Sequence, residues 1–108
     1  MKRECMDETC PVARSVAVLD GKWTMLVLRD LLRGTKRFSQ LRESLTGISP
    51  KTLTDRLRAL EEQGMVQRLI YPEIPPRVEY TLTERGRGVE PVINALAAWS
   101  GGTPLAEL

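Results

Sequence analysis

The segment SPKTLTDRLRALEEQG, residues 49–64, carries the clearest helix signals in the chain. Ser49 is a favoured N-cap residue, Pro50 suits the first helical position, and a glycine closes the segment, so a helix is predicted from about Pro50 to Gln63. Three leucines share one stripe of this helix: Leu53, Leu57 and Leu60. Polar side chains occupy the opposite face, so one side of the helix is expected to pack on a core while the other faces outward.

Helical spacing of apolar residues predicts three further helices earlier in the chain. The first begins at Pro11, with Cys10 as its cap, and ends before Asp20 and Gly21. The second, KWTMLVLRDLLRG, is apolar almost all round and is therefore expected to be buried on several sides. The third, RFSQLRESLTG, is short and ends at Gly47.

A β-hairpin is predicted after the helix of residues 50–63. The segments MVQRLIY and RVEYTLT flank the proline-rich tip PEIPP, and in the second segment apolar and polar residues alternate as in a half-buried strand. The last segment, ERGRGVEPVINALAAWS, has apolar residues at helical spacing, and Pro91 is expected to kink this helix or to mark its true start. Because no repeat and no long linker divides the chain, residues 1–108 are predicted to form a single domain.

Two short helices separated by a tight turn and followed by a hairpin are the order of a winged helix-turn-helix. The predicted fold class is α+β, mostly helical, with a β-hairpin wing and a C-terminal dimerisation helix. In such a fold the helix that begins at Pro50 enters the major groove of DNA by its N-terminal half. Leu96 and Trp99 are expected to form a dimer surface with the first helix, because so small a domain must cover the outer sides of these helices.

Basic residues concentrate in the middle of the chain. Between Arg33 and Arg58 there are seven basic residues and two acids, a net charge of +5 in a chain whose total is +2. This distribution predicts one face for a polyanion, although a run of charge is more often just a solvated surface. The candidate DNA-binding residues are Lys36, Arg37, Ser49, Lys51, Thr52, Asp55, Arg56, Arg58 and Arg77.

Structural alternatives remain open for several of these residues. Capping alone would account for Ser49, and Asp55 either accepts from a cytosine amino group or orients a neighbouring cation. Arg56 lies nearer the leucine stripe, where an intramolecular ion pair explains it equally well. Arg77, beside the proline-rich tip, is expected to reach the minor groove or to be simply exposed. The aromatic residues sit on apolar faces, which favours core packing or dimer contact over base stacking: Trp23, Phe38, Tyr80 and Trp99.

Enzymatic function finds no support in the sequence. The chain has no histidine, no nucleophile elbow, no glycine-rich phosphate loop and no set of four metal ligands, so neither catalysis nor a cofactor is expected. No apolar run approaches the roughly 20 residues of a membrane helix, and the N-terminus lacks the apolar stretch of a signal peptide. A cytoplasmic location without a membrane partner is therefore predicted.

The sequence resembles the HxlR-type winged helix-turn-helix transcriptional regulators, relatives of the MarR group. The resemblance covers about Cys10 to Trp99 and rests on a Cys-Pro opening, GKWT, the RF pair before the short helix, GISPKTLTDRLRAL and PPRVEYTLTERG. It implies a small bacterial homodimer that binds a pseudo-palindromic operator in double-stranded DNA and regulates nearby genes. The alternative interpretation is a winged-helix protein-interaction module that does not bind DNA.

Both cysteines, Cys5 and Cys10, lie in the first ten residues and cannot staple the fold together. Cys10 stands at the start of the first predicted helix, where backbone amides and the helix dipole favour a thiolate. The resemblance points the same way, because several members of the family sense oxidants or electrophiles through a cysteine at this Cys-Pro position. Cys10 is therefore a candidate redox or electrophile sensor that would pair with Cys5 or across a dimer, and a capping or packing role is the alternative.

Overall fold

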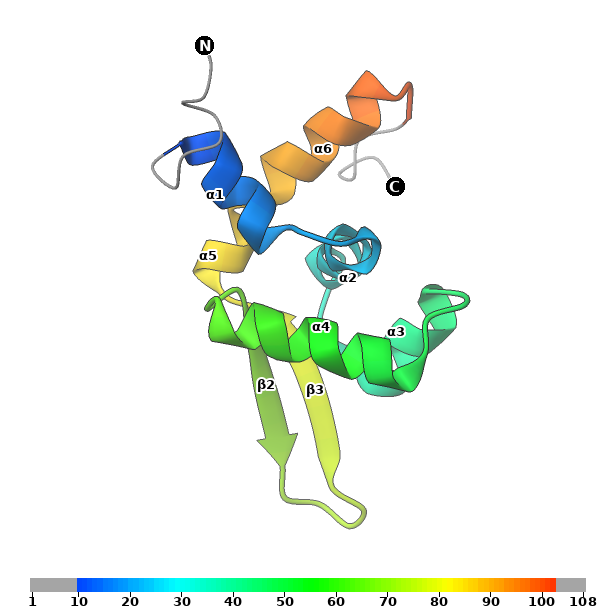
Figure 1. Ribbon diagram of the computed structural model, residues 1–108. Helices are drawn as coiled ribbons and strands as arrows, with labels where there is room; N and C mark the ends of the chain where they lie inside the picture. The colour runs from blue at the N-terminus through cyan, green and yellow to red at the C-terminus, as the bar shows by residue number, and fades with distance from the viewer. Residues whose placement is uncertain (1–9, 103–108) are drawn as a thin grey trace.

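The structure is a computed structural model of the chain and describes residues 10–102. Its elements are α1 (Pro11–Val18), α2 (Lys22–Leu32), β1 (Lys36–Arg37), α3 (Phe38–Ser44), α4 (Pro50–Glu62), β2 (Val66–Tyr71), β3 (Arg77–Leu82), α5 (Glu84–Arg87) and α6 (Glu90–Trp99). In Figure 1, α4 crosses in front of the base of the β2–β3 hairpin, and α1 and α6 stand at the end of the molecule away from the hairpin tip.

The hydrophobic core forms around α2. Val27 and Leu28 of this helix are fully buried, and the predicted leucine stripe of α4 is at most 1% exposed. Side chains from α3 and its C-cap, β2, β3 and α6 close the core, among them Leu41, Leu45, Val66, Leu82 and Ile93. The predictions of an α2 buried on several sides and of an α4 with one buried face are therefore confirmed.

The hairpin belongs to an antiparallel sheet with the strand order β1-β3-β2. Tyr80 of β3 lies opposite Lys36 on one side and Arg68 on the other. Because directly paired residues share a face, these side chains start from the same face as Leu82, which is buried in the core beneath α4. Arg77 starts from the opposite face. The sequence did not predict β1, since a strand of two residues is too short to show alternation.

Helix α4 begins where the sequence predicts. The Ser49 hydroxyl accepts the backbone N–H of Thr52 at 3.0 Å, and Pro50 occupies the first turn. Gly64 follows the helix with a φ of +75°, a conformation that favours glycine. Near the C-terminus Pro91 lies in the first turn of α6, so of its two predicted roles the structure shows a helix start.

Candidate nucleic-acid interface

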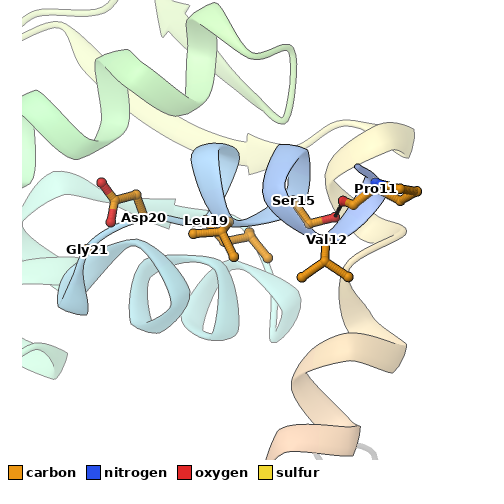
Figure 2. A pocket seen from close by; sticks show the side chains of 7 residues that line it. Pro11, Val12, Ser15, Leu19, Asp20 and Gly21 are labelled. Atoms are coloured by element: carbon orange, nitrogen blue, oxygen red, sulfur yellow. Dashed lines mark hydrogen bonds between the residues drawn. The ribbon is translucent and has the colours of Figure 1, made fainter. Parts of the chain in front are cut away.

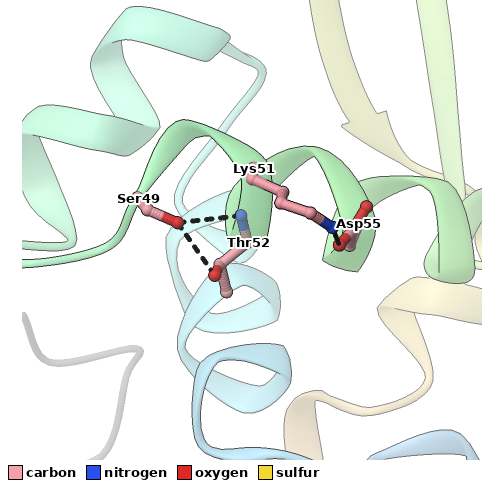
Figure 3. A network of polar contacts seen from close by, with 4 residues as sticks. All are labelled: Ser49, Lys51, Thr52 and Asp55. Carbon is pink, nitrogen blue, oxygen red and sulfur yellow. Dashed lines mark hydrogen bonds and ion pairs between the residues drawn. The ribbon is translucent and has the colours of Figure 1, made fainter.

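The outer face of α4 presents polar side chains in its N-terminal half (Figure 3). The Nζ of Lys51 lies 3.0 Å from Oδ2 of Asp55, and both side chains are exposed. The Ser49 hydroxyl donates to the Thr52 hydroxyl at 2.9 Å in addition to capping the helix. Asp55 therefore orients Lys51. An exposed pair of this kind is worth at most about 1 kcal/mol, so Lys51 can turn to another anion at little cost.

Arg56 and Arg58 leave α4 in different directions. Arg56 is half-buried, and its Nη1 lies 3.7 Å from the point where a Cβ on Gly21 would stand. Its guanidinium thus packs beside the connection between α1 and α2 instead of joining the outer face of α4. Arg58 is exposed and borders a cleft between α4 and the hairpin. The cleft is lined by Thr54, Leu57, Arg58, Glu61, Arg68 and Tyr80.

Arg77 lies near the hairpin tip but on the face of the sheet away from α4. Its guanidinium carbon is 4.1 Å from the centroid of the Tyr71 ring, and its nitrogens pair with Glu73 at 3.2 Å and Glu79 at 3.5 Å. The longer approach is an ion pair without hydrogen-bond geometry, which leaves the buried Nε without a hydrogen-bond partner. The expectation that Arg77 is simply exposed is wrong, because its side chain is 31% exposed and two carboxylates balance its charge.

Lys36 and Arg37 form β1 and lead directly into α3. Arg37 is exposed at the N-cap position of α3, where its backbone N–H donates to the Gln40 side chain at 2.8 Å. Lys36 is half-buried, with its Nζ 3.9 Å from the point where a Cβ on Gly34 would stand. Both cations, which the sequence predicted as candidate DNA-binding residues, therefore lie at the entrance to the helix-turn-helix.

The cleft between α4 and the hairpin contains a functional candidate that the sequence prediction missed, Arg68. Burial raises the pKa of the Tyr80 hydroxyl above its ordinary value, Glu61 adds to this effect, and the neighbouring Arg68 opposes it. Tyr80 thus keeps its proton at neutral pH and can donate a hydrogen bond. The alternation within MVQRLIY could have placed Arg68 on the same face as the buried Val66, but not opposite Tyr80.

Helices α1 and α6 stand at the end of the molecule away from the hairpin tip (Figure 1), and both expose apolar side chains. Trp99 is 87% exposed, so among its predicted roles core packing within the chain is wrong. Helix α1 has no buried residue, and a groove runs along it to the start of α2 (Figure 2). The large exposed apolar residues of the two helices are Val12, Val16, Val92, Leu96 and Trp99. Both helices therefore present uncovered apolar surface.

Cys10 is half-buried at the N-terminus of α1. It occupies the N-cap position with extended dihedrals, Pro11 follows in the first turn, and the Arg14 N–H donates to the Cys10 carbonyl at 3.0 Å. The structure thus places Cys10 at a helix start, as predicted, and next to the apolar surface of α1. Cys5 lies outside the described residues.

Two helices at a tight turn, with an exposed polar face on the second and a hairpin beside it, define a winged helix-turn-helix protein. The HxlR-like helix-turn-helix family matches residues 18–104, and the chain belongs to this family. Over 87 residues it is 55% identical to an uncharacterised HTH-type transcriptional regulator of Synechocystis sp.. That match covers 81% of this chain but only 64% of the Synechocystis protein.

Solved structures agree with this assignment. A protein of Porphyromonas gingivalis W83 assigned to the MarR family of transcriptional regulators superposes with a TM-score of 0.84 at 41% identity, covering 87% of this chain and 92% of that one. The redox regulator HypR in its oxidised form gives a TM-score of 0.80 at 40% identity, covering 84% of this chain and 94% of that one. These relatives are named as regulators and not as enzymes. Within residues 10–102, no helix combines the length and hydrophobicity needed to cross a membrane.

Proposed function

We propose that this chain is a transcriptional regulator that binds operator DNA as a homodimer. The observation that carries the proposal is the exposed N-terminal half of α4, which stands beside a wing in a chain of the HxlR-like family. Lys51 is the first candidate for a base or phosphate contact, since its ammonium is held only by an exposed ion pair. Ser49 and Thr52 can contribute hydroxyl contacts to phosphates, and Lys36 and Arg37 can contact the adjacent backbone.

The proposed roles of the remaining candidates follow from their surroundings. Asp55 acts on DNA through Lys51, which it orients. Arg56 supports the fold beside Gly21, and Arg77 stabilises the hairpin tip through its paired carboxylates. Arg58 is the cation that faces the wing. The DNA-contacting set is therefore narrower than the basic residues of the sequence alone imply.

The exposed apolar surface of α1 and α6 supports a two-fold dimer in this proposal. Two copies of α4 related by a two-fold axis must meet successive major grooves, which sets half-sites about 10 bp apart or a small multiple of that distance. A second copy of the chain would cover the exposed side chains of α1 and α6 in a mainly apolar, symmetric interface.

Leu96→Glu is expected to shift the chain from dimer to monomer at micromolar concentration, because the new carboxylate would be buried in the apolar interface without a partner. Sedimentation velocity measures this change. Ala98→Glu is the matched control, since Ala98 is also exposed but leaves α6 on the other side, and this variant should remain dimeric. A monomeric parent at that concentration would rule out the dimer.

Thiol regulation is part of the proposal and is supported by the relatives. HypR is a redox regulator, and a similar solved structure is that of diamide-treated YodB from Bacillus subtilis. In this chain an oxidant such as diamide would take two electrons and two protons from two thiols as their sulfurs join. A disulfide at Cys10 would displace α1 and change the spacing of the two α4 helices in the dimer.

Diamide treatment is expected to lower the operator affinity of the parent by at least about tenfold, which corresponds to an interaction free energy of 1.4 kcal/mol. The Cys10→Ser variant should bind operator with the same affinity before and after treatment. Fluorescence anisotropy measures both affinities, and mass spectrometry verifies that Cys10 has reacted. An unchanged affinity in the fully modified parent would leave Cys10 with a structural role.

The alternative function is a protein-interaction module that uses the same faces without DNA. A mobility-shift experiment with chromosomal fragments separates the two functions. A regulator slows the migration of specific fragments even in the presence of excess unrelated DNA. An interaction module shifts no fragment.

A further inference from the structure

We infer that the cleft between α4 and the hairpin is a phosphate site, in which Arg58 and Arg68 hold one phosphate of the DNA backbone. The inference rests on the proposed function and extends it to a strand residue and a contact that α4 alone does not make.

The cleft brings together side chains from three elements. Thr54 and Arg58 come from α4, Arg68 from β2 and Tyr80 from β3, around a space of about 210 Å³. The strand register fixes Arg68 directly opposite Tyr80, on the sheet face that lies beneath α4. Two guanidinium groups and two hydroxyl groups therefore border a single opening from its two sides.

The path of DNA explains why a phosphate should lie in this opening. A recognition helix occupies the major groove while a wing reaches toward the adjacent minor groove. The backbone strand that separates the two grooves must then pass between helix and wing. In this protein residues of α4 and of the β2–β3 hairpin line the cleft, and α4 crosses the base of that hairpin (Figure 1).

The charges in the cleft suit an anion. Two arginines face one acid, Glu61, so the cleft has a net positive charge. Within residues 10–102 neither Arg58 nor Arg68 has a carboxylate at ion-pair distance, whereas Arg77 on the other face of the sheet has two. Guanidinium groups match phosphate oxygens with paired hydrogen bonds. Because Tyr80 stays protonated, its hydroxyl can donate to the same phosphate.

The first test uses Arg68→Ala and a duplex that the parent protein has selected from a random-sequence pool. Affinity should fall by about tenfold on the selected duplex and on a scrambled duplex alike, because a phosphate contact carries no sequence information. The slope of log affinity against log salt should flatten by about 0.9 for each copy bound. Arg87→Ala removes the same charge from an exposed position on α5 and should change neither quantity.

The second test neutralises single phosphates of the selected duplex as methylphosphonates. Neutralising one phosphate of each half-site, in the backbone between the major and minor grooves, should lower the affinity of the parent by about tenfold. The same neutralised duplex should lower the affinity of Arg68→Ala no further, because this variant already lacks the contact. Arg68→Gln, which keeps the length and polarity of the side chain, should behave as the alanine variant does, with an unchanged thermal unfolding midpoint.

Two results would overturn the inference while the proposed function stands. One is an Arg68→Ala variant with parental affinity and salt slope. The other is an Arg68→Ala variant whose affinity falls as much as that of the parent when this phosphate is neutralised. If the parent itself selects no duplex, the proposed function fails first, and the inference fails with it.

Discussion

Gly86→Ala is expected to lower the free energy of unfolding by about 3 kcal/mol, at the upper end of overpacking effects. A Cβ at this buried position would stand 2.2 Å from the Met65 carbonyl oxygen and 2.9 Å from Cδ2 of Leu82. The first of these contacts is with backbone, which no change of rotamer can relieve. The Thr83 hydroxyl, which donates to the Gly64 carbonyl, also accepts the Gly86 N–H, so α5 cannot move without breaking this cap.

Gly88→Ala provides the matched control for this loss of stability. At Gly88 the nearest atom to an added Cβ is the Arg85 carbonyl oxygen at 3.2 Å, and the backbone φ is −63°. This alanine is expected to change the unfolding free energy by less than about 1 kcal/mol. Urea denaturation followed by circular dichroism compares the two variants. Equal midpoints for both would show that α5 does not pack against Met65 as described.

Lys51→Glu is expected to reduce operator affinity by at least about 100-fold. The variant removes a cation from the first turn of α4 and puts a carboxylate where phosphates or base acceptors approach, and like charges in an interface cost several kcal/mol. Because Lys51 is exposed and its pair with Asp55 is worth little, the fold should be preserved. Fluorescence anisotropy at fixed salt measures the loss.

Lys22→Glu reverses the same charge at an exposed position on α2, where the ammonium lies 4.7 Å from the centroid of the Trp23 ring. Its operator affinity should stay within about threefold of the parent, since Lys22 lies outside the outer face of α4 and salt weakens the effect of an exposed charge that does not contact the DNA. If both variants lost operator affinity to a similar extent, the effect of Lys51→Glu would come from the overall charge. This result would contradict the proposal that α4 contacts the DNA bases.

Helix α4 could be predicted from sequence because its signals are local. Ser49, Pro50 and Gly64 mark its ends, and the leucine spacing fixes its buried face, so the structure reproduces both. The same local signals predicted that Asp55 could orient a neighbouring cation, since residues three or four apart on a helix are neighbours, and the structure shows that this cation is Lys51. No knowledge of the rest of the fold was needed for either result.

The remaining features of the candidate interface depend on contacts between distant parts of the chain. Arg77 differs from a free basic residue because the hairpin brings Tyr71, Glu73 and Glu79 around it. Arg68 became a candidate only when the strand register placed it opposite Tyr80. Side-chain alternation gives the face of a strand residue, but it gives neither the partner strand nor the helix that lies over that face.

Selection of duplexes from a random-sequence pool by the parent protein tests most directly whether α4 reads DNA as part of a two-fold dimer. The expected product is an inverted repeat whose half-sites lie about 10 bp apart, or a small multiple of that distance, and which the protein binds at least about 1,000-fold more tightly than unrelated DNA at physiological salt. A selected pool that shows no repeated motif and binds no more tightly than the starting pool would contradict operator recognition by this chain.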